Sequence, residues 1–404
     1  MRQVRKRLGS ILLTAAMLIS LLPMTAFAEG DVAQVGTGDS AQTYQTLQAA
    51  IDAVGDGTET ITLLQDTEEQ ITVSKGSITL DLNGKTISYE SGDMFDTRAR
   101  GITVQGGNLH IVDGVGNGTV KSNGYVVYNL GGTITIDAGT YTKGQGYFFL
   151  YSVYNARGTT VINGGTFTGG VASGQESLCT INGGNFAQLP EGVIFNAAVL
   201  APRDGQQYMA VYKTMEEFVE EYSSVFSYDT TTSTMKLLED WSSPDSDLLF
   251  NTAFTLDLNN HTLDMGAHLM LVYTEGVVTI QDNAGNGTLQ SNDSSTVVTL
   301  GTLNLESGNM KLELTKDYPA GCGAVMVQDN GTFNMTGGSI YLDTNDFRGG
   351  YCVTDTDFSY SGTVAHINLT GGTITMEEAK EIFYSNACVN ITGRETHAAI
   401  GEDI

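Results

Sequence analysis

Four aspartates in the second half of the chain have a spacing that could support hydrolytic chemistry. Two carboxylates held apart can act as general acid and as nucleophile or base in glycoside hydrolysis. The same oxygens would also suit Ca²⁺, although no EF-hand loop and no Gly-Gly-x-Gly-x-Asp repeat is present. Because the chain holds 46 acidic residues, such a cluster also arises as ordinary solvated turn residues, which is our interpretation. The four are Asp343, Asp346, Asp355 and Asp357.

The histidines, serines and cysteines form no motif of a known catalytic or metal site. The five histidines are scattered without a His-x-x-x-His spacing, and no Gly-x-Ser-x-Gly phrase occurs. The four cysteines have neither metal-ligand spacing nor a simple pairing, so we expect them to be buried as small apolar residues. We therefore predict no catalytic residue, no metal and no cofactor. The cysteines are Cys179, Cys322, Cys352 and Cys388.

Repeated tyrosines are the best candidate binding feature. The phrase Tyr-Val-Val-Tyr-Asn at 125–129 matches Tyr-Ser-Val-Tyr-Asn at 151–155, an offset of 26 residues. Strand side chains alternate between two faces, so Tyr128 and Tyr154 share a face with Ser152, which indicates that this face is outward. We predict that Tyr128 and Tyr154 form an exposed platform for sugar rings. The alternative is ordinary surface tyrosine, which strands favour anyway.

A short phrase that recurs along the chain predicts the elements that must position these residues. Ile-Thr-Ile-Asp-Ala-Gly-Thr-Tyr at 134–141 returns as Thr-Val-Ile-Asn-Gly-Gly-Thr-Phe at 160–167 and as Cys-Thr-Ile-Asn-Gly-Gly-Asn-Phe at 179–186. Further copies begin at Leu303, Phe333 and Ile367. The alternating apolar positions are typical of strands, and the one-directional repetition favours parallel stacking rather than hairpins. The sequence predicts an all-β fold, a right-handed parallel β-helix solenoid whose turns absorb the variable spacing.

Aligning the copies predicts columns of like side chains inside the stack, buried against one another from coil to coil. A polar row of Asp137, Asn163 and Asn182 is expected at the turns, bonded up and down, with glycine at positive φ after it. The predicted first-half columns are Ile134, Thr160, Cys179; Ile136, Ile162, Ile181; and Tyr141, Phe167, Phe186. The predicted second-half columns are Leu303, Phe333, Ile367 and Leu305, Met335, Leu369.

A longer duplication overlies the short repeat. The segment at 79–87 matches 255–263, and Asp-Gly-Val-Gly-Asn-Gly at 113–118 matches Asp-Asn-Ala-Gly-Asn-Gly at 282–287. Apolar stripes over Leu47–Val54 and Met215–Tyr222 predict a short helix capping each module, which would cover exposed strand edges. The expected domains are a signal peptide at 1–28, a linker at 29–42, module 1 at 43–205 and module 2 at 206–404.

The beginning of the chain resembles an export signal. Basic residues at 2–7, an apolar run at 11–22 and Ala-Phe-Ala at 26–28 fit a signal peptide cut before Glu29. Residues 1–28 hold four of the 19 basic residues and none of the 46 acidic ones, leaving 15 against 46, a formal −31. So negative a chain is not expected to bind nucleic acid or anionic lipid. No later segment predicts a membrane span.

The phrase at 78–87, followed by repeated Ile-Asn-Gly-Gly-Thr-Phe, resembles the pectin-lyase-like, right-handed parallel β-helix surface proteins of gut-dwelling Gram-positive bacteria. This resemblance covers nearly all of the chain after residue 28. It implies a secreted or cell-surface bacterial protein that acts as an adhesin, binds a glycan or a protein partner, or serves as a rigid stalk. The alternative is a polysaccharide lyase or hydrolase of the same fold, but the phrases typical of polygalacturonases are missing.

Overall fold

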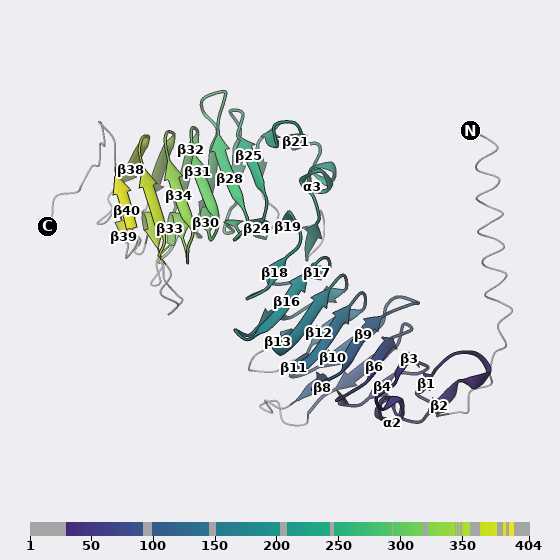
Figure 1. Cartoon of the computed structure of the whole chain (residues 1–404). Helices are drawn as coiled ribbons and strands as arrows, with labels where there is room; N and C mark the ends of the chain where they lie inside the picture. Colours follow the sequence, from purple (N-terminus) through teal and green to yellow (C-terminus); the bar gives the residue numbers. More distant parts are fainter. Residues whose placement is uncertain are drawn as a thin grey trace, which may run out of the picture.

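The computed structural model describes residues 30–91, 99–144, 151–202, 208–242, 246–292, 294–317, 322–343, 345, 347, 350–355, 364–377, 383–384 and 388–391. Regular structure in this part is mostly β-strand, as the sequence predicted, in four sheets that we name A to D (Figure 1). No helix in the described ranges is long and apolar enough to cross a membrane. The predicted signal peptide at 1–28 lies outside the described residues.

Sheet A has 12 strands, all from the first half of the chain. They are β1 (Ala33–Val35), β2 (Gln42–Tyr44), β3 (Thr58–Leu63), β5 (Ile71–Val73), β6 (Ser77–Asp81), β8 (Arg100–Val104), β9 (Asn108–Val112), β11 (Tyr125–Ile136), β13 (Tyr151–Ile162), β15 (Gly170–Ser173), β16 (Ser177–Ile181) and β18 (Ile194–Phe195).

Sheet B has 14 strands and runs through both halves of the chain. They are β4 (Thr67–Glu68), β7 (Thr86–Tyr89), β10 (Thr119–Ser122), β12 (Thr140–Lys143), β14 (Thr166–Phe167), β17 (Asn185–Phe186), β19 (Val199–Pro202), β20 (Met209–Tyr212), β24 (Leu248–Phe250), β27 (Met270–Val272), β30 (Val297–Thr299), β33 (Cys322–Val327), β36 (Gly350–Asp355) and β39 (Phe383–Tyr384).

Sheets C and D belong to the second half and have 8 and 6 strands. Sheet C contains β21 (Phe226–Asp229), β22 (Thr234–Leu237), β25 (Ala253–Asp257), β28 (Val277–Gln281), β31 (Thr302–Leu305), β34 (Thr332–Met335), β37 (His366–Leu369) and β40 (Cys388–Ile391). Sheet D contains β23 (Trp241–Ser242), β26 (Thr262–Asp264), β29 (Thr288–Asn292), β32 (Asn309–Glu313), β35 (Ser339–Asp343) and β38 (Thr373–Glu377).

The chain visits its sheets in a fixed order, which produces parallel pairing. In the second half, β25, β26 and β27 lie in sheets C, D and B, and each pairs in parallel with the strand three later. In the first half, β11 and β13 are each 12 residues long, and each pairs with two shorter strands along its length. The N-terminal part of β11 pairs with β8 and its C-terminal part with β9. The predicted one-directional stacking is therefore present in both halves.

The predicted columns are confirmed by strand register and burial. Ile136, Ile162 and Ile181 are successive partners in β11, β13 and β16, and all three are fully buried. Thr160 separates Ile134 and Cys179 in the adjacent column. The second-half columns beginning at Leu303 and Leu305 are also in register and buried. Matched apolar side chains therefore fill the interior, where their burial is the main source of stability.

The aromatic column is the most regular part of the core. The rings of Tyr141 and Phe167 stack with centroids 5.0 Å apart, and those of Phe167 and Phe186 are 5.1 Å apart. In both pairs the ring planes are only 10° from parallel. The reason is that neighbouring parallel strands place equivalent positions of the repeat directly above each other. Two of the strands that carry them, β12 and β17, are labelled in Figure 1, and β14 lies between these two in sheet B.

The predicted polar row is a continuous chain of side-chain hydrogen bonds. Asn163 Nδ2 donates to Asp137 Oδ1 at 2.8 Å, and Asn182 Nδ2 donates to Asn163 Oδ1 at 2.7 Å. The row is longer than predicted, because His110 contacts Asp137 at one end and Asn196 donates to Asn182 at the other. As predicted, glycines at positive φ close these turns: Gly139, Gly165 and Gly184 have φ of 97°, 100° and 114°.

Both predicted helices are present. The first, α2 (Leu47–Val54), buries Leu47, Ala50, Ile51 and Val54, and its N-cap Thr46 accepts from the Ala49 amide. The second, α3 (Met215–Glu221), begins after the N-cap Thr214 and buries Met215, Phe218 and Val219. Apolar residues at helical spacing therefore face the strands while polar residues face solvent.

The N-terminal edge of the first half is covered by α2 and by a hairpin. Strand β1 pairs antiparallel with β3 and β2, and a 3-10 turn, η1 (Gly38–Ser40), lies between β1 and β2. Residues 30–42, predicted to be linker, therefore include a strand of sheet A. The Gln48 amide group pairs with the edge strand β5, since its Nε2 donates to Thr72 O and its Oε1 accepts from Thr72 N. A side chain thus satisfies an edge backbone that would otherwise invite association.

The two halves share one wall. Strands β19 and β20 are antiparallel and join the first-half strand β17 to the second-half strand β24 (Figure 1). Along β19, Val199 and Ala201 belong to the second-half core, whereas Leu200 belongs to the first-half core. Since successive strand residues face opposite sides, the two cores lie on opposite faces of sheet B. The junction predicted near 189–209 is thus a packed wall, and residues 203–207 of it lie outside the described residues.

Candidate functional site

The repeated tyrosines form one aromatic surface cluster on neighbouring strands β11 and β13. The Tyr128 and Tyr154 rings stack with centroids 5.7 Å apart, and those of Tyr125 and Tyr151 are 6.1 Å apart. The two stacked pairs also touch, since Tyr125 lies 4.8 Å from Tyr128 in an edge-on arrangement. All four side chains are partly exposed. We call these four residues the tyrosine platform.

The predicted alternation of faces was wrong at this point. Val126 and Val127 are both fully buried, so the tyrosines on either side of them emerge on the same surface. Ser152, predicted to face outward, is 0% exposed; its hydroxyl donates to Tyr141 O at 2.7 Å and accepts from the Gly169 amide. The pairing of β13 with β15 shifts register between Tyr151 and Val153, and such irregularity breaks strict alternation.

An arginine that sequence reasoning did not assign completes the cluster. The Arg100 guanidinium lies over the Tyr128 ring, 4.3 Å from its centroid, a cation–π contact. Arg100 pairs in register with Tyr125, so it occupies the equivalent position one strand earlier. Its Nε is buried and makes no hydrogen bond within the described residues. The signal was available in the spacing: Arg100 precedes Tyr125 by 25 residues, close to the repeat offset of 26.

The hydroxyls of Tyr125 and Tyr151 remain neutral at physiological pH. Burial raises the pKa of Tyr125, and the neighbouring Tyr128 and Tyr154 hydroxyls raise it further. Burial also raises the pKa of Tyr151, helped by the negative charge of Glu191. A neutral phenol both donates and accepts a hydrogen bond while its ring presents an apolar face. The platform can therefore stack against a ring and hydrogen-bond its hydroxyl groups.

Buried asparagines hold the backbone beneath the platform. Asn129, one residue after Tyr128, is fully buried, and its Oδ1 accepts from the Gly131 and Gly132 amides. Asn155 occupies the same position on β13, and its Nδ2 donates to Leu178 O at 2.9 Å. These bonds fix the bend that follows each tyrosine phrase. The platform therefore stands on rigid strands rather than on a loop.

The acidic cluster does not form a carboxylate pair within the described residues. Asp343 Oδ1 accepts from the Asn345 amide at 3.1 Å, which is a turn interaction. Asp346, Asp357 and the side chain of Asp355 lie outside the described residues. Within the described ranges, no group of three His, Cys, Asp or Glu residues could hold a metal ion. Of the four aspartates, the structure therefore places only the side chain of Asp343.

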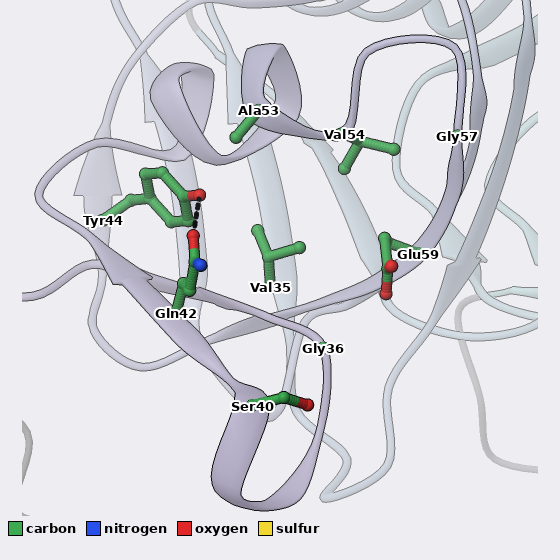
Figure 2. Close-up of a pocket in the computed structure, with 9 residues that line it drawn as sticks. All are labelled: Val35, Gly36, Ser40, Gln42, Tyr44, Ala53, Val54, Gly57 and Glu59. Carbon is green, nitrogen blue, oxygen red and sulfur yellow. Dashed lines mark hydrogen bonds between the residues drawn. The ribbon is translucent and has the colours of Figure 1, made fainter.

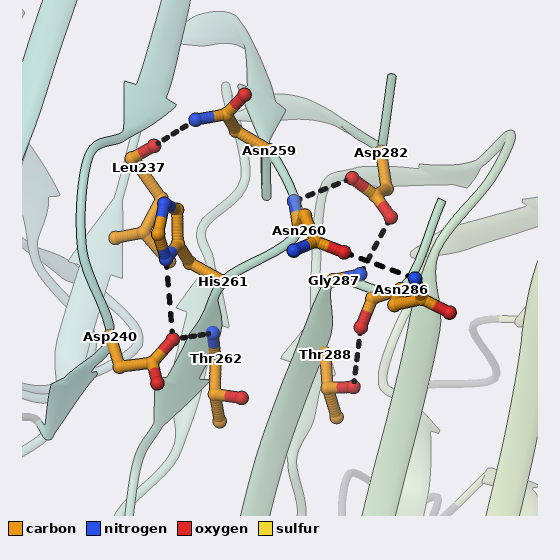
Figure 3. A network of polar contacts seen from close by, with 10 residues as sticks. All are labelled: Leu237, Asp240, Asn259, Asn260, His261, Thr262, Asp282, Asn286, Gly287 and Thr288. Carbon is orange, nitrogen blue, oxygen red and sulfur yellow. Dashed lines mark hydrogen bonds and ion pairs between the residues drawn. The ribbon is translucent and has the colours of Figure 1, made fainter. Parts of the chain in front are cut away.

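The duplicated aspartates serve the backbone in both halves. Asp282 Oδ1 accepts from the Asn260 and Ala284 amides, and its Oδ2 accepts from the Gly285 and Gly287 amides (Figure 3). Asp113, its counterpart, accepts from the Gly84 and Gly118 amides. Burial alone would raise the pKa of Asp282, but these amide bonds hold it below its usual value. Both carboxylates are therefore structural anions that close the turns.

Replacing Asp282 by asparagine is expected to lower the free energy of unfolding by about 2 kcal/mol, because hydrogen bonds to a buried charge are lost. Asp282 is 6% exposed, and an amide NH₂ would face amide donors. Its lowered pKa means the stabilisation is present at neutral pH and disappears as pH falls below about 4. Urea unfolding at pH 7 and at pH 3 should show the difference from the unmodified chain shrinking in acid. The exposed Asp52→Asn is the control, and an equal effect of both variants would contradict the role.

Three of the described histidines, His110, His261 and His268, each contact one aspartate at the surface. The distance from His110 Nε2 to Asp137 Oδ2 is 2.6 Å, and His261 Nδ1 lies 3.3 Å from Asp240 Oδ1 (Figure 3). His268 similarly faces Asp247 at 3.5 Å. Within the described residues no serine hydroxyl contacts these three pairs, so none of them resembles a nucleophile–base–acid arrangement. His397 lies outside the described residues.

The described cysteines are core residues. Cys179, Cys322 and Cys352 are buried, as the sequence predicted. Burial raises the pKa of Cys179 and of Cys352 to about 12, so both remain protonated and unreactive at neutral pH. The side chain of Cys388 lies outside the described residues. The three described thiols therefore contribute packing rather than chemistry.

The geometry leaves the tyrosine platform as the best candidate site of this chain. Comparisons with protein-family models, with curated proteins and with solved structures found no match for the sequence or the fold.

Proposed function

We propose that this chain is an exported bacterial surface protein that binds carbohydrate through the tyrosine platform and catalyses no reaction. In this proposal both halves are closed, right-handed parallel β-helix modules. The regular parallel pairing of each strand with its equivalent one coil later supports such a solenoid. The basic and apolar start of the chain supports export. A rigid rod with an aromatic binding surface on its side suits an adhesin.

The single observation that carries the binding proposal is the stacked and partly exposed set of four tyrosine rings. Neutral aromatic rings side by side offer a flat apolar surface edged by hydroxyl groups, which matches the faces and rims of sugar rings. Stacking pairs at 5.7 and 6.1 Å extend along the rod, so a linear glycan could contact successive rings. The overall negative charge favours a neutral glycan over a polyanion.

The platform also supports binding rather than turnover. Arg100 contacts the platform with its guanidinium held over Tyr128, and Glu191 is a single carboxylate whose charge acts on Tyr151. The duplicated turn carboxylates, Asp113 and Asp282, are engaged by backbone amides. A glycosidase needs two carboxyl groups that face a shared bond. A protein partner at the platform, or a purely mechanical stalk role, would replace the glycan proposal if no sugar binds.

The double variant Tyr128→Ala, Tyr154→Ala is expected to lose at least tenfold in affinity for glycans bound by the unmodified chain, equivalent to about 1.4 kcal/mol. A glycan array identifies the ligands, titration calorimetry measures affinity, and a reducing-sugar assay checks for cleavage. Tyr341→Ala is the matched control, because Tyr341 is a partly exposed strand tyrosine beside Lys311 on another sheet. Equal binding by the double variant and the control would remove the platform from the proposal, and glycan cleavage would replace binding with catalysis.

A further inference from the structure

A cavity of about 340 Å³ lies at the N-terminal end of the first half, far in sequence from the tyrosine platform. It is open to solvent and is lined by the C-terminal end of α2, the hairpin of β1 and β2, and the start of β3 (Figure 2). Its volume is in the range of cavities that hold small ligands. Apolar side chains form part of the lining, and polar groups stand at its sides. The lining residues used below are Val35, Gln42, Tyr44, Ala53, Val54 and Glu59.

Glu59 gives the cavity a negative charge that the described residues leave unneutralised. It is the one charged side chain among the lining residues. No hydrogen bond or ion pair of the described part of the chain engages its carboxylate. The carboxylate lies beside Gly36, where a Cβ would be 3.8 Å from Glu59 Oε2, an ordinary contact distance. The C-terminal end of α2 adds further negative potential through its last carbonyl groups.

The opposite side of the cavity is aromatic and amide in character. Tyr44 and Gln42 lie across from Glu59 with Val35 between them (Figure 2). The Tyr44 hydroxyl donates to Gln42 Oε1 at 3.1 Å, which orients the amide and leaves its NH₂ group available. Val35 and Val54 provide apolar contact between the two sides. The cavity thus combines an anionic wall, an apolar middle and an aromatic wall with a hydrogen-bond donor.

We propose that this cavity binds a primary ammonium group carried on a short aliphatic stem. The ammonium would pair with Glu59, since an unpaired carboxylate favours a cation over a neutral group. The stem would pack on Val35 and Val54, and the Tyr44 ring would contact the far end. A lysine side chain of a partner peptide and a free polyamine share this chemistry. The site is separate from the tyrosine platform and does not depend on carbohydrate binding.

The test uses n-butylammonium as the probe and n-butanol as its neutral equivalent. Saturation-transfer NMR and calorimetry measure the binding of each to the full exported chain. The ammonium is expected to bind at least tenfold more tightly than the alcohol, and Glu59→Gln is expected to remove that preference. Glu59 is exposed, so the variant should fold, which circular dichroism checks. Glu176→Gln, an exposed acid in a distant turn, is the matched control and should bind like the unmodified chain.

A second variant addresses the cavity itself. Ala53→Leu enlarges an exposed side chain that lines it and is expected to weaken butylammonium binding without changing the net charge. Spermidine and a lysine peptide acetylated only at its α-amino group distinguish the free amine from the lysine side chain. Preferential binding of either one at Glu59 supports the proposal. Equal binding of butanol and butylammonium, or an unaltered preference in Glu59→Gln, would overturn it.

Discussion

Replacing Leu200 by aspartate is expected to unfold both halves of the chain together. Leu200 is 0% exposed and belongs to the first-half core, while its neighbours Val199 and Ala201 on β19 belong to the second-half core. A buried charge without a partner costs about 3–5 kcal/mol, a large part of the stability of an ordinary domain. Since β19 is a wall of both cores, its displacement exposes apolar side chains on each side. Unfolding of one half should therefore cause the other half to unfold.

The single tryptophan allows the unfolding of the second half to be measured separately from that of the whole chain. Trp241 packs against Tyr222 and Phe226 in the second half, so its fluorescence follows that half, whereas far-UV circular dichroism follows both. Leu200→Asp should lower the midpoint of thermal unfolding by the same amount in both signals. Ile194→Asp, a nearby apolar residue that is 50% exposed, should change little. An unchanged Trp241 transition beside a lowered dichroism transition would show that the halves unfold independently.

Phe167→Ala is expected to lower the free energy of unfolding by about 4 kcal/mol, because the variant leaves a ring-sized gap in the middle of the core. Phe167 is fully buried and stacks on both sides, on Tyr141 and on Phe186. Parallel strands hold these neighbours at a fixed spacing, so the core cannot collapse into the space. The loss should lie near the upper part of the range for aromatic truncations.

Urea denaturation at neutral pH measures this loss. Phe167→Leu, which keeps much of the apolar volume, should cost clearly less than the alanine variant. Thr166→Ala is the neighbouring control, because Thr166 belongs to the same strand and is partly exposed. If Phe167→Ala changed the unfolding free energy by less than about 1 kcal/mol, the aromatic column would not be a principal source of stability.

The stacked interior was predictable because it repeats. Residues such as Ile136, Ile162 and Ile181 recur in the same short phrase, and a parallel stack places equivalent positions in contact. The polar row from Asp137 to Asn182 followed for the same reason. Both capping helices could be predicted from their apolar spacing alone. Local periodicity carries this information, so no knowledge of distant contacts was needed.

Features that depend on a bend or on unrepeated contacts could not be predicted. Strict alternation placed Ser152 on the surface, whereas two consecutive buried positions turn the strand and bring Tyr125 beside Tyr128. Arg100 contacts the platform through its register with β11, and its spacing from Tyr125 was the one signal in the sequence, because no repeated phrase surrounds it. The cavity at Glu59 is formed by a hairpin and a helix that occur once at that end. Such sites depend on tertiary contacts that periodicity does not encode.

The shared wall at β19 and β20 also limits how a chain of this kind can change length during evolution. A gene break between the halves would leave each product with one bare apolar side of sheet B, because Leu200 and Val199 face different interiors. Duplication of a single coil within either half would instead add matched positions to existing columns and leave the wall intact. The chain should therefore gain or lose length by whole repeats away from the junction. The arrangement of the two halves should then stay unchanged.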